Sequence, residues 1–156
     1  MGNVKLKVGD ACPEFTLLDH NGEQFHFQTK DGNFKIVYFY PKDDTKVCTA
    51  EACSFRDWKD EIDPGIQIIG ISGDSPASHL KFRAGHQLNF TLLSDPKGKV
   101  RKQFGAQSFF GLIPDRVTYL IDGSGKIRFV YQALLEGKAH AEKVDEQLRE
   151  IMNEKE

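Results

Sequence analysis

The chain has 156 residues, a formal charge of -2 at pH 7, and 39% hydrophobic, 11% aromatic and 28% charged residues. This length suits a single domain over residues 1–156, and the composition excludes a disordered or fibrous chain. Without a global basic field, we expect no binding to nucleic acid or to an anionic membrane. No apolar run reaches the ~18 residues of a spanning helix, and the first residues follow neither a signal nor a transit pattern. We therefore expect a soluble, cytoplasmic protein.

Strand patterns dominate the first quarter of the chain. Phe15–Phe27 contains two apolar stretches around Asn21 and Gly22, and an Asn-Gly pair in this setting indicates a β-hairpin. Phe34–Tyr40 is a β-branched and aromatic run with little alternation, which is typical of a strand covered on both faces. Pro41 ends this strand.

Helical patterns then alternate with strands. An apolar stripe through Cys48, Ala52, Phe55 and Ile62 predicts a helix that starts at Thr45. The remaining predicted elements are a strand at Ile66–Ile71, a helix from Pro76 to about Gly85 capped by Ser75, a strand at Thr91–Leu93, a short helix from Asp95-Pro96 to about Phe104, a hairpin of Val117–Ile121 and Ile127–Tyr131, and a helix from Lys138 to about Met152. This order predicts an α/β domain with a mixed sheet and helices on both faces.

Cys48 lies in the first turn of the helix that follows a central strand. Amides without intrahelical partners and the positive end of the helix dipole favour a thiolate there. Thr45 is expected to cap the helix, and its hydroxyl can reach a sulfur or a bound oxygen. Pro41 has a fixed φ and no amide hydrogen, which helps to form a rigid turn over the site. This position favours a reactive thiol over the alternative, a small buried core residue.

Cys53 follows five residues after Cys48. On an ideal helix their Cα atoms lie roughly 8.6 Å apart, beyond the ~4.4–6.8 Å that a disulfide needs. The pair can bridge only if the first turns of the helix unwind. A zinc site is disfavoured because Cys12 is the only other cysteine and the histidines show no paired ligand spacing. Cys12 is interpreted as a lone thiol, and a disulfide from it to either other cysteine stays open.

The segment PKDDTKVCTAEACSFRD (Pro41–Asp57) resembles the active-site segment of the peroxiredoxins, which share a Pro-x-x-x-Thr-x-x-Cys pattern. The cysteine five residues on is similar to the subgroup called bacterioferritin comigratory protein or peroxiredoxin Q. The similarity extends through GDACPEFTLLDHNGE, FKIVYFYPKDDT, GISGDSPASHLKF, LLSDPKGKVRKQFG and RVTYLIDGSGKIRFVY. Departures are Lys46 and Val47, where many relatives carry proline and glycine, and Cys12. The resemblance implies a thioredoxin-like fold, with a central mixed β-sheet flanked by helices and an N-terminal β-hairpin.

The same resemblance implies a thiol-dependent peroxidase of the atypical two-cysteine type. Hydrogen peroxide and organic hydroperoxides would be substrates, thioredoxin or a similar dithiol protein the reductant, and a monomer the working state. Cys48 would be the peroxidatic cysteine and Cys53 the intramolecular resolving cysteine. Pro41 would shield the sulfur, Thr45 would hydrogen-bond the peroxide, and Arg116 would stabilise the thiolate and polarise the peroxide. No metal, haem or flavin is implied.

Two other functions stay open. A thiol–disulfide oxidoreductase acting on protein substrates is disfavoured by the lack of a C-x-x-C motif. A binding or holdase protein with redox-sensing cysteines would react slowly with peroxide and associate with clients on oxidation. Phe39, Phe109 and Phe110 are candidates either for an apolar collar around the peroxide or for ordinary packing.

Overall fold

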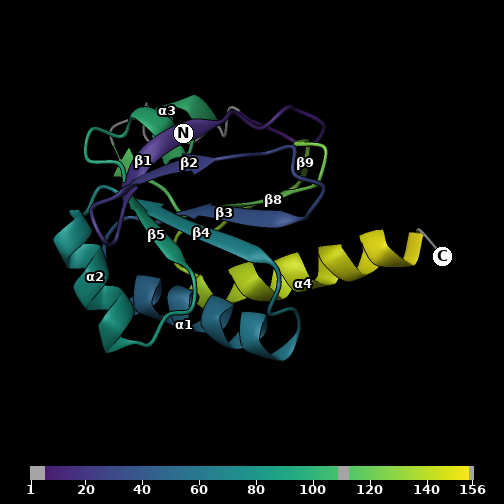
Figure 1. Cartoon of the computed structure of the whole chain (residues 1–156). Coiled ribbons are helices and arrows are strands. Elements are labelled where there is room, and N and C mark those ends of the chain that lie inside the picture. Colours follow the sequence, from purple (N-terminus) through teal and green to yellow (C-terminus); the bar gives the residue numbers. More distant parts are fainter. Residues whose placement is uncertain (1–5, 109–112, 155–156) are drawn as a thin grey trace.

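The computed structural model describes residues 6–108 and 113–154, which form a mixed sheet with helices on both faces (Figure 1). The strands of the main sheet are β1 (Phe15–Asp19), β2 (Gln24–Phe27), β3 (Lys35–Phe39), β4 (Gln67–Ser72), β5 (Thr91–Ser94), β8 (Val117–Ile121) and β9 (Ile127–Gln132), and β6 (Gln107–Ser108) pairs separately with β7 (Ile113–Pro114). The helices are α1 (Lys46–Glu61), α2 (Pro76–Gly85), α3 (Lys99–Phe104) and α4 (Gly137–Glu154). Over the described ranges, no helix is both long and apolar enough to cross a membrane.

The seven strands of the main sheet lie in the order β2-β1-β5-β4-β3-β8-β9. At the centre, β4 pairs in parallel with both β3 and β5, whereas β1 and β8 join this core in antiparallel fashion. Helices α1 and α4 lie side by side on one face, and α3 covers the other (Figure 1). The loop between β3 and α1 therefore leaves the carboxyl end of a central parallel strand, where the sequence predicts chemistry.

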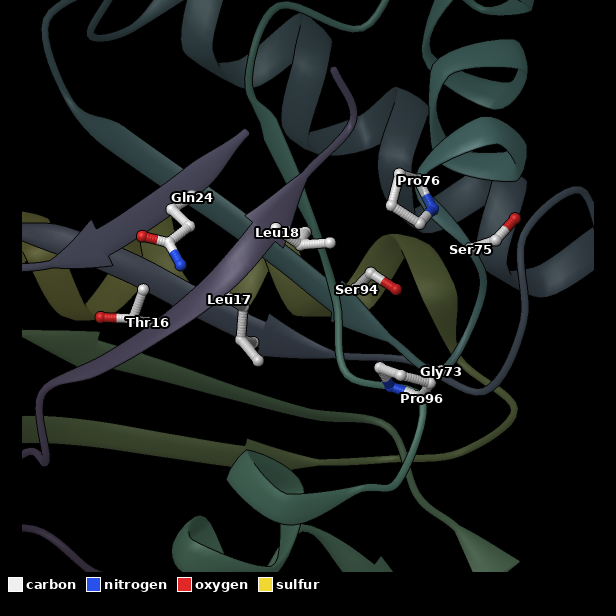
Figure 2. A pocket seen from close by; sticks show the side chains of 9 residues that line it. All are labelled: Thr16, Leu17, Leu18, Gln24, Gly73, Ser75, Pro76, Ser94 and Pro96. Atoms are coloured by element: carbon white, nitrogen blue, oxygen red, sulfur yellow. The ribbon is translucent and has the colours of Figure 1, made fainter. Parts of the chain in front are cut away.

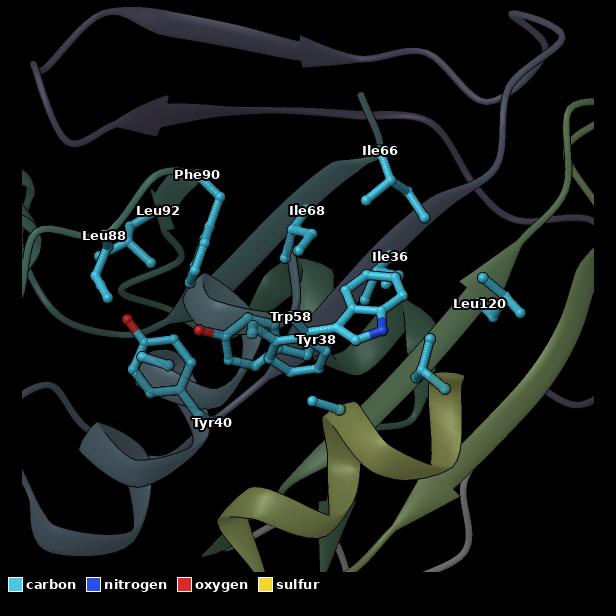
Figure 3. Close-up of a cluster of buried hydrophobic side chains, with 14 of the residues drawn as sticks. Ile36, Tyr38, Tyr40, Trp58, Ile66, Ile68, Leu88, Phe90, Leu92 and Leu120 are labelled. Atoms are coloured by element: carbon cyan, nitrogen blue, oxygen red, sulfur yellow. The ribbon is translucent and has the colours of Figure 1, made fainter. Parts of the chain in front are cut away.

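Two hydrophobic clusters, one on each face, hold the sheet between the helices. On the face of α1 and α4, Tyr38 stacks on Phe55 with ring centroids 4.8 Å apart and lies close to Trp58 (Figure 3). On the other face, Phe39 packs against Phe104 of α3 at 5.0 Å. Every residue of β3 is buried, which explains the lack of alternation in its sequence. Phe39 is thus a core residue rather than part of a collar.

Most predicted elements are confirmed within one or two residues. The hairpin turns at Gly22, which has a positive φ of 77° that glycine adopts without strain. The short third helix starts at Lys99 rather than near Pro96, because Gly98 at φ 67° precedes it and the Asp95 carboxylate accepts hydrogen bonds from amides of its first turn. The pairing of β6 with β7 was not predicted from the sequence.

Candidate active site

Cys48 lies in the first turn of α1 with its side chain buried, only 2% exposed. Cys53 lies on the same helix and is partly exposed. The helix is continuous over both residues, and both thiols are free. This agrees with the predicted geometry, in which an intact helix keeps the two sulfurs from bridging.

Arg116 reaches Cys48 because of the register of the sheet. Val117 pairs with Phe39 at the carboxyl end of β3, so the preceding Arg116 lies at the same edge as the loop that leads to α1. The side chain is buried; its Nη1 donates to Glu51 Oε1 at 2.7 Å and its Nε to the Leu134 carbonyl at 2.7 Å. Burial alone would lower the pKa of Arg116. The charges of Glu51 and Cys48 and hydrogen bonds to both side chains act more strongly in the opposite direction, so the pKa of Arg116 is raised. The structure therefore brings these two predicted residues together.

Glu51 is a site residue that the sequence reasoning missed. It is fully buried, and burial raises its pKa to about 8 despite the opposing effect of Arg116. It lies three residues after Cys48 and four before Phe55, so it falls on the apolar stripe of α1. A carboxylate on that stripe is the signal that identifies it, because an acidic residue there has to be paired inside the protein.

A neutral histidine lies behind Glu51. His140 of α4 is buried, its Nε2 donates to the Ala133 carbonyl at 2.9 Å, and its Nδ1 accepts from the Thr118 hydroxyl at 2.7 Å. Burial lowers the pKa of His140 to about 4. The 3.4 Å contact between Nδ1 and Glu51 Oε2 is therefore not an ion pair at neutral pH. Neither that oxygen nor the Tyr38 hydroxyl has a hydrogen-bond partner in the described part of the chain.

Thr45 occupies the N-cap position of α1 in an extended conformation. Its hydroxyl forms no capping bond and donates instead to the Lys42 carbonyl at 3.0 Å. The expected capping bond is thus absent, and the hydroxyl is held on the loop that precedes Cys48. Pro41 opens the same loop and is partly buried.

A buried network around Asp43 fixes the loop from Pro41 to Thr45. Asp43 accepts a hydrogen bond from the Tyr40 hydroxyl at 2.5 Å, lies 2.7 Å from Nδ1 of His79, and donates its amide to Asp74 at 2.8 Å. The three ligand atoms of Asp43, Asp74 and His79 lie within 4.8 Å of one another, as a metal site would require. Hydrogen bonds already engage these side chains, so the cluster is explained as an anchor for the loop.

Cys12 is separated from the other two cysteines by the sheet. It belongs to the hydrophobic cluster of α3, whereas Cys48 belongs to the cluster of α1 and α4. Burial raises the pKa of Cys12 to about 12, and its thiol donates to the Pro13 carbonyl at 3.5 Å. The interpretation as a lone thiol fits this environment. The other collar candidates, Phe109 and Phe110, lie outside the described residues.

An open hollow of about 460 Å³ lies away from these residues (Figure 2). It is bounded by β1, the start of α2 and the segment after β5, and its lining residues are Thr16, Leu17, Leu18, Gln24, Gly73, Ser75, Pro76, Ser94 and Pro96. None of them is a predicted site residue. Cys48 is thus held in a packed, buried setting rather than in this hollow.

The sequence and the fold are similar to those of known proteins. Residues 8–130 match the AhpC/TSA family. Peroxiredoxin Q of Oryza sativa subsp. japonica is 41% identical over 138 residues, which cover 87% of this chain and 64% of the relative. Peroxiredoxin Q of Arabidopsis thaliana is 40% identical over 148 residues, which cover 94% of this chain and 67% of the relative. The chain thus spans about two thirds of the length of these plant relatives.

Solved structures share the architecture. Peroxidoxin BcpB from Mycobacterium tuberculosis is 34% identical with a TM-score of 0.84, covering 94% of this chain and 98% of the other. A peroxiredoxin Q variant from Xanthomonas campestris is 28% identical with a TM-score of 0.79, covering 94% and 97%. The expected thioredoxin-like fold is confirmed.

One expectation is wrong. We expected a cytoplasmic protein, but the rice and Arabidopsis relatives that this chain matches are named as chloroplastic proteins. Because this chain aligns with only part of each relative, its first residues are no guide to a targeting segment. The resemblance to peroxiredoxin Q is confirmed, and the chain belongs to the AhpC/TSA family.

Proposed function

We propose that this chain is a thiol-dependent peroxidase that reduces hydrogen peroxide and organic hydroperoxides through Cys48. One observation carries the proposal: the Cys48 thiol is held in the first turn of α1 against the buried guanidinium of Arg116. A helix N-terminus and a fixed cation both favour the thiolate, which is the nucleophilic form of cysteine.

The reaction begins when the Cys48 thiolate attacks one peroxide oxygen. A sulfur–oxygen bond forms, the oxygen–oxygen bond breaks, and Cys48 becomes a sulfenic acid. The departing oxygen leaves as hydroxide or alkoxide and takes up a proton to give water or an alcohol. Arg116, the Thr45 hydroxyl and the first-turn amides supply donors for the developing charge, and Pro41 shields the sulfur from bulk water. No step needs a cofactor.

Glu51 holds Arg116 in place without cancelling its charge. The 2.7 Å bond to Oε1 and the bond to the Leu134 carbonyl fix the orientation of the guanidinium. Because burial raises the pKa of Glu51 to about 8, its carboxyl neutralises the guanidinium less than an ordinary carboxylate would. The positive charge of Arg116 then acts on Cys48 and on the peroxide.

Cys53 resolves the oxidised state. After the first turns of α1 unwind, its thiol attacks the Cys48 sulfenic acid, a disulfide forms and water leaves. A thioredoxin-like dithiol protein reduces the disulfide by exchange and is itself oxidised. The whole cycle takes place within one monomer.

Rapid-mixing fluorescence tests this proposal. Trp58 lies on α1, and its Nε1 donates to Asp145 of α4 at 2.9 Å, so unwinding of the helix changes its surroundings. With hydrogen peroxide, we expect a fast second-order phase that Cys48→Ser removes and a slower phase that Cys53→Ser removes. Cys12→Ala is the matched control and should keep both phases.

Thiols are counted in the same samples, because a silent fluorophore by itself proves nothing. Loss of two thiols per chain in the wild type, and of one in Cys53→Ser, is expected. Thiols that survive an excess of peroxide would contradict a peroxidase and favour the binding alternative.

A further inference from the structure

His140 is a buried titratable side chain that the proposed reaction does not use. It lies on α4, and its ring packs against that of Tyr131 with centroids 4.7 Å apart. Its Nε2 lies 2.9 Å from the Ala133 carbonyl oxygen, which only accepts hydrogen bonds, so Nε2 carries a hydrogen. Nδ1 of the neutral ring is then an acceptor, and the Thr118 hydroxyl donates to it at 2.7 Å. Nδ1 is therefore the atom of this ring that neighbouring donors can reach.

The carboxyl group of Glu51 presents an unpaired oxygen to this nitrogen. Oε1 accepts a hydrogen bond from Nη1 of Arg116 at 2.7 Å. Oε2 is buried without a donor among residues 6–108 and 113–154, and it lies 3.4 Å from Nδ1 of His140. A buried charged oxygen without a donor is costly, and here it would also face the lone pair of an unprotonated nitrogen. A proton on Oε2 removes both difficulties, because the carboxyl becomes neutral and gains an O–H that faces an acceptor.

The surroundings favour this proton on the carboxyl rather than on the ring. With a proton on Nδ1, His140 would be a second buried cation at the carboxyl that already binds Arg116. Burial lowers the pKa of His140 to about 4, and the charge of Arg116 acts in the same direction. Burial raises the pKa of Glu51 to about 8, although Arg116 opposes this. Geometry and pKa directions thus agree on a neutral ring beside a neutral carboxyl.

We propose that His140 is a positioning residue of the peroxide site: its Nδ1 holds the proton of a neutral Glu51 carboxyl, which orients Arg116 without cancelling the positive charge. The proposal rests on the proposed function, in which that charge acts on the thiolate and on the peroxide. A neutral carboxyl still accepts from Arg116 through Oε1, so the guanidinium keeps its orientation. An ionised carboxyl at the same 2.7 Å would balance the charge. His140 acts through Glu51 and not on the reacting atoms.

Infrared spectroscopy of the reduced wild type tests the proposal, because a protonated carboxyl has a carbonyl stretch that a carboxylate lacks. An ordinary glutamate is ionised at pH 7, so we expect a carboxyl band at this pH that Glu51→Gln removes. The loss of this band with rising pH gives the midpoint of Glu51 ionisation. Other titratable groups that face the pair also shape the midpoint, and all are retained: Tyr38, Asp115, Arg116, Tyr131 and Glu136.

Three variants test the part played by His140, with the exposed His26→Leu as the control that should leave the midpoint in place. His140→Leu removes the acceptor and should move the midpoint to lower pH by about one unit, the size that one lost hydrogen bond supports. His140→Asn keeps an acceptor oxygen close to the position of Nδ1 and should stay nearer to the wild type. Thr118→Val removes the hydroxyl that competes for Nδ1 and should move the midpoint to higher pH.

Two infrared results would overturn the proposal. One is a spectrum at neutral pH from which Glu51→Gln removes no carboxyl band. The other is an unchanged midpoint in every folded variant among His140→Leu and Thr118→Val, which keeps the test decisive even if one of them fails to fold.

The same variants connect the proton to the reaction. Because ionisation of Glu51 balances the charge of Arg116, the rate constant with hydrogen peroxide should fall on the alkaline side, at the infrared midpoint. In His140→Leu this fall should move with the midpoint, and a fall that stays in place would overturn the role of His140. The infrared titration needs no peroxide. A protein with the expected band that leaves peroxide untouched would therefore end the peroxidase proposal while the proton on Glu51 stands.

Discussion

Substituting glutamine for His140 and substituting glutamine for Glu51 should change the slope of the free energy of unfolding against pH in opposite directions. The two side chains face each other at 3.4 Å and are both fully buried. Burial lowers the pKa of His140 from 6.5 to about 4 and raises that of Glu51 from 4.5 to about 8. In an unfolded chain both groups titrate at their ordinary values, so each links folding to the uptake or release of a proton.

The signs of the two effects differ. Between pH 6.5 and 4 the unfolded chain binds a proton at His140 that the folded chain does not, so stability is lost as the pH falls. Between pH 4.5 and 8 the folded chain keeps a proton at Glu51 that the unfolded chain releases, so stability is lost as the pH rises. At about 1.4 kcal/mol per pH unit, the full effects are about 3 kcal/mol for the histidine and about 5 kcal/mol for the glutamate.

In the shared window from pH 4.5 to 6.5 the two slopes oppose each other in the wild type. His140→Gln should leave only the glutamate effect, a stability that falls with rising pH by about 1 kcal/mol per unit relative to wild type. Glu51→Gln should leave the histidine effect, a stability that rises by a similar amount. Urea unfolding followed by Trp58 fluorescence measures both, with the exposed His26→Gln as the control. If the slopes of the two variants deviate from the wild-type slope in the same direction, the reasoning is refuted.

Other substitutions test the site and its packing. Arg116→Lys keeps the charge but loses the planar group held between two acceptors, so the rate constant with hydrogen peroxide should fall about 100-fold; an unchanged rate in rapid mixing would contradict the assigned role. Gly137→Ala places a Cβ 2.4 Å from the Val47 carbonyl, so thermal unfolding should show a loss of about 1–3 kcal/mol. Gly85→Ala, where nothing lies within 4 Å, is its control and should not destabilise the protein. Native Cys12 should stay unlabelled by iodoacetamide in mass spectra, because burial raises its pKa to about 12; rapid labelling would contradict this.

Local features of the sequence were enough to predict most of the fold. The Asn-Gly pair, the unbroken apolar run of β3 and the cysteine just after Thr45 each act within a few neighbouring residues, and the structure agrees with them. The start of α3 was misplaced because the Asp95 carboxylate reaches forward to amides five and six residues later. That contact depends on the positive φ of Gly98, and the pattern of apolar residues does not predict a backbone conformation of this kind.

The environment of Cys48 was only partly predictable. Cys48 and Arg116 were both predicted as site residues, the latter through the family resemblance alone. Glu51 and His140 come from two different helices and meet beside Arg116 only once the sheet register and the helix packing are set. Burial changes the pKa values of these side chains. The spacing of residues along the sequence does not show which polar side chains will be buried.

If Cys48 and Cys53 form a disulfide as proposed, the anchoring of Asp43 decides which part of the segment around Cys48 has to move. Buried hydrogen bonds hold the loop up to Thr45 against α2 and the segment after β4. This loop therefore cannot move with Cys48 when Cys48 approaches Cys53. The extra length has to come from the first turns of α1, beginning with rupture of the bond from the Thr49 amide to the Thr45 carbonyl. The Val47 carbonyl, against which Gly137 is packed, lies inside that stretch. Oxidation of the cysteine pair would therefore also displace the beginning of α4, which packs on that stretch.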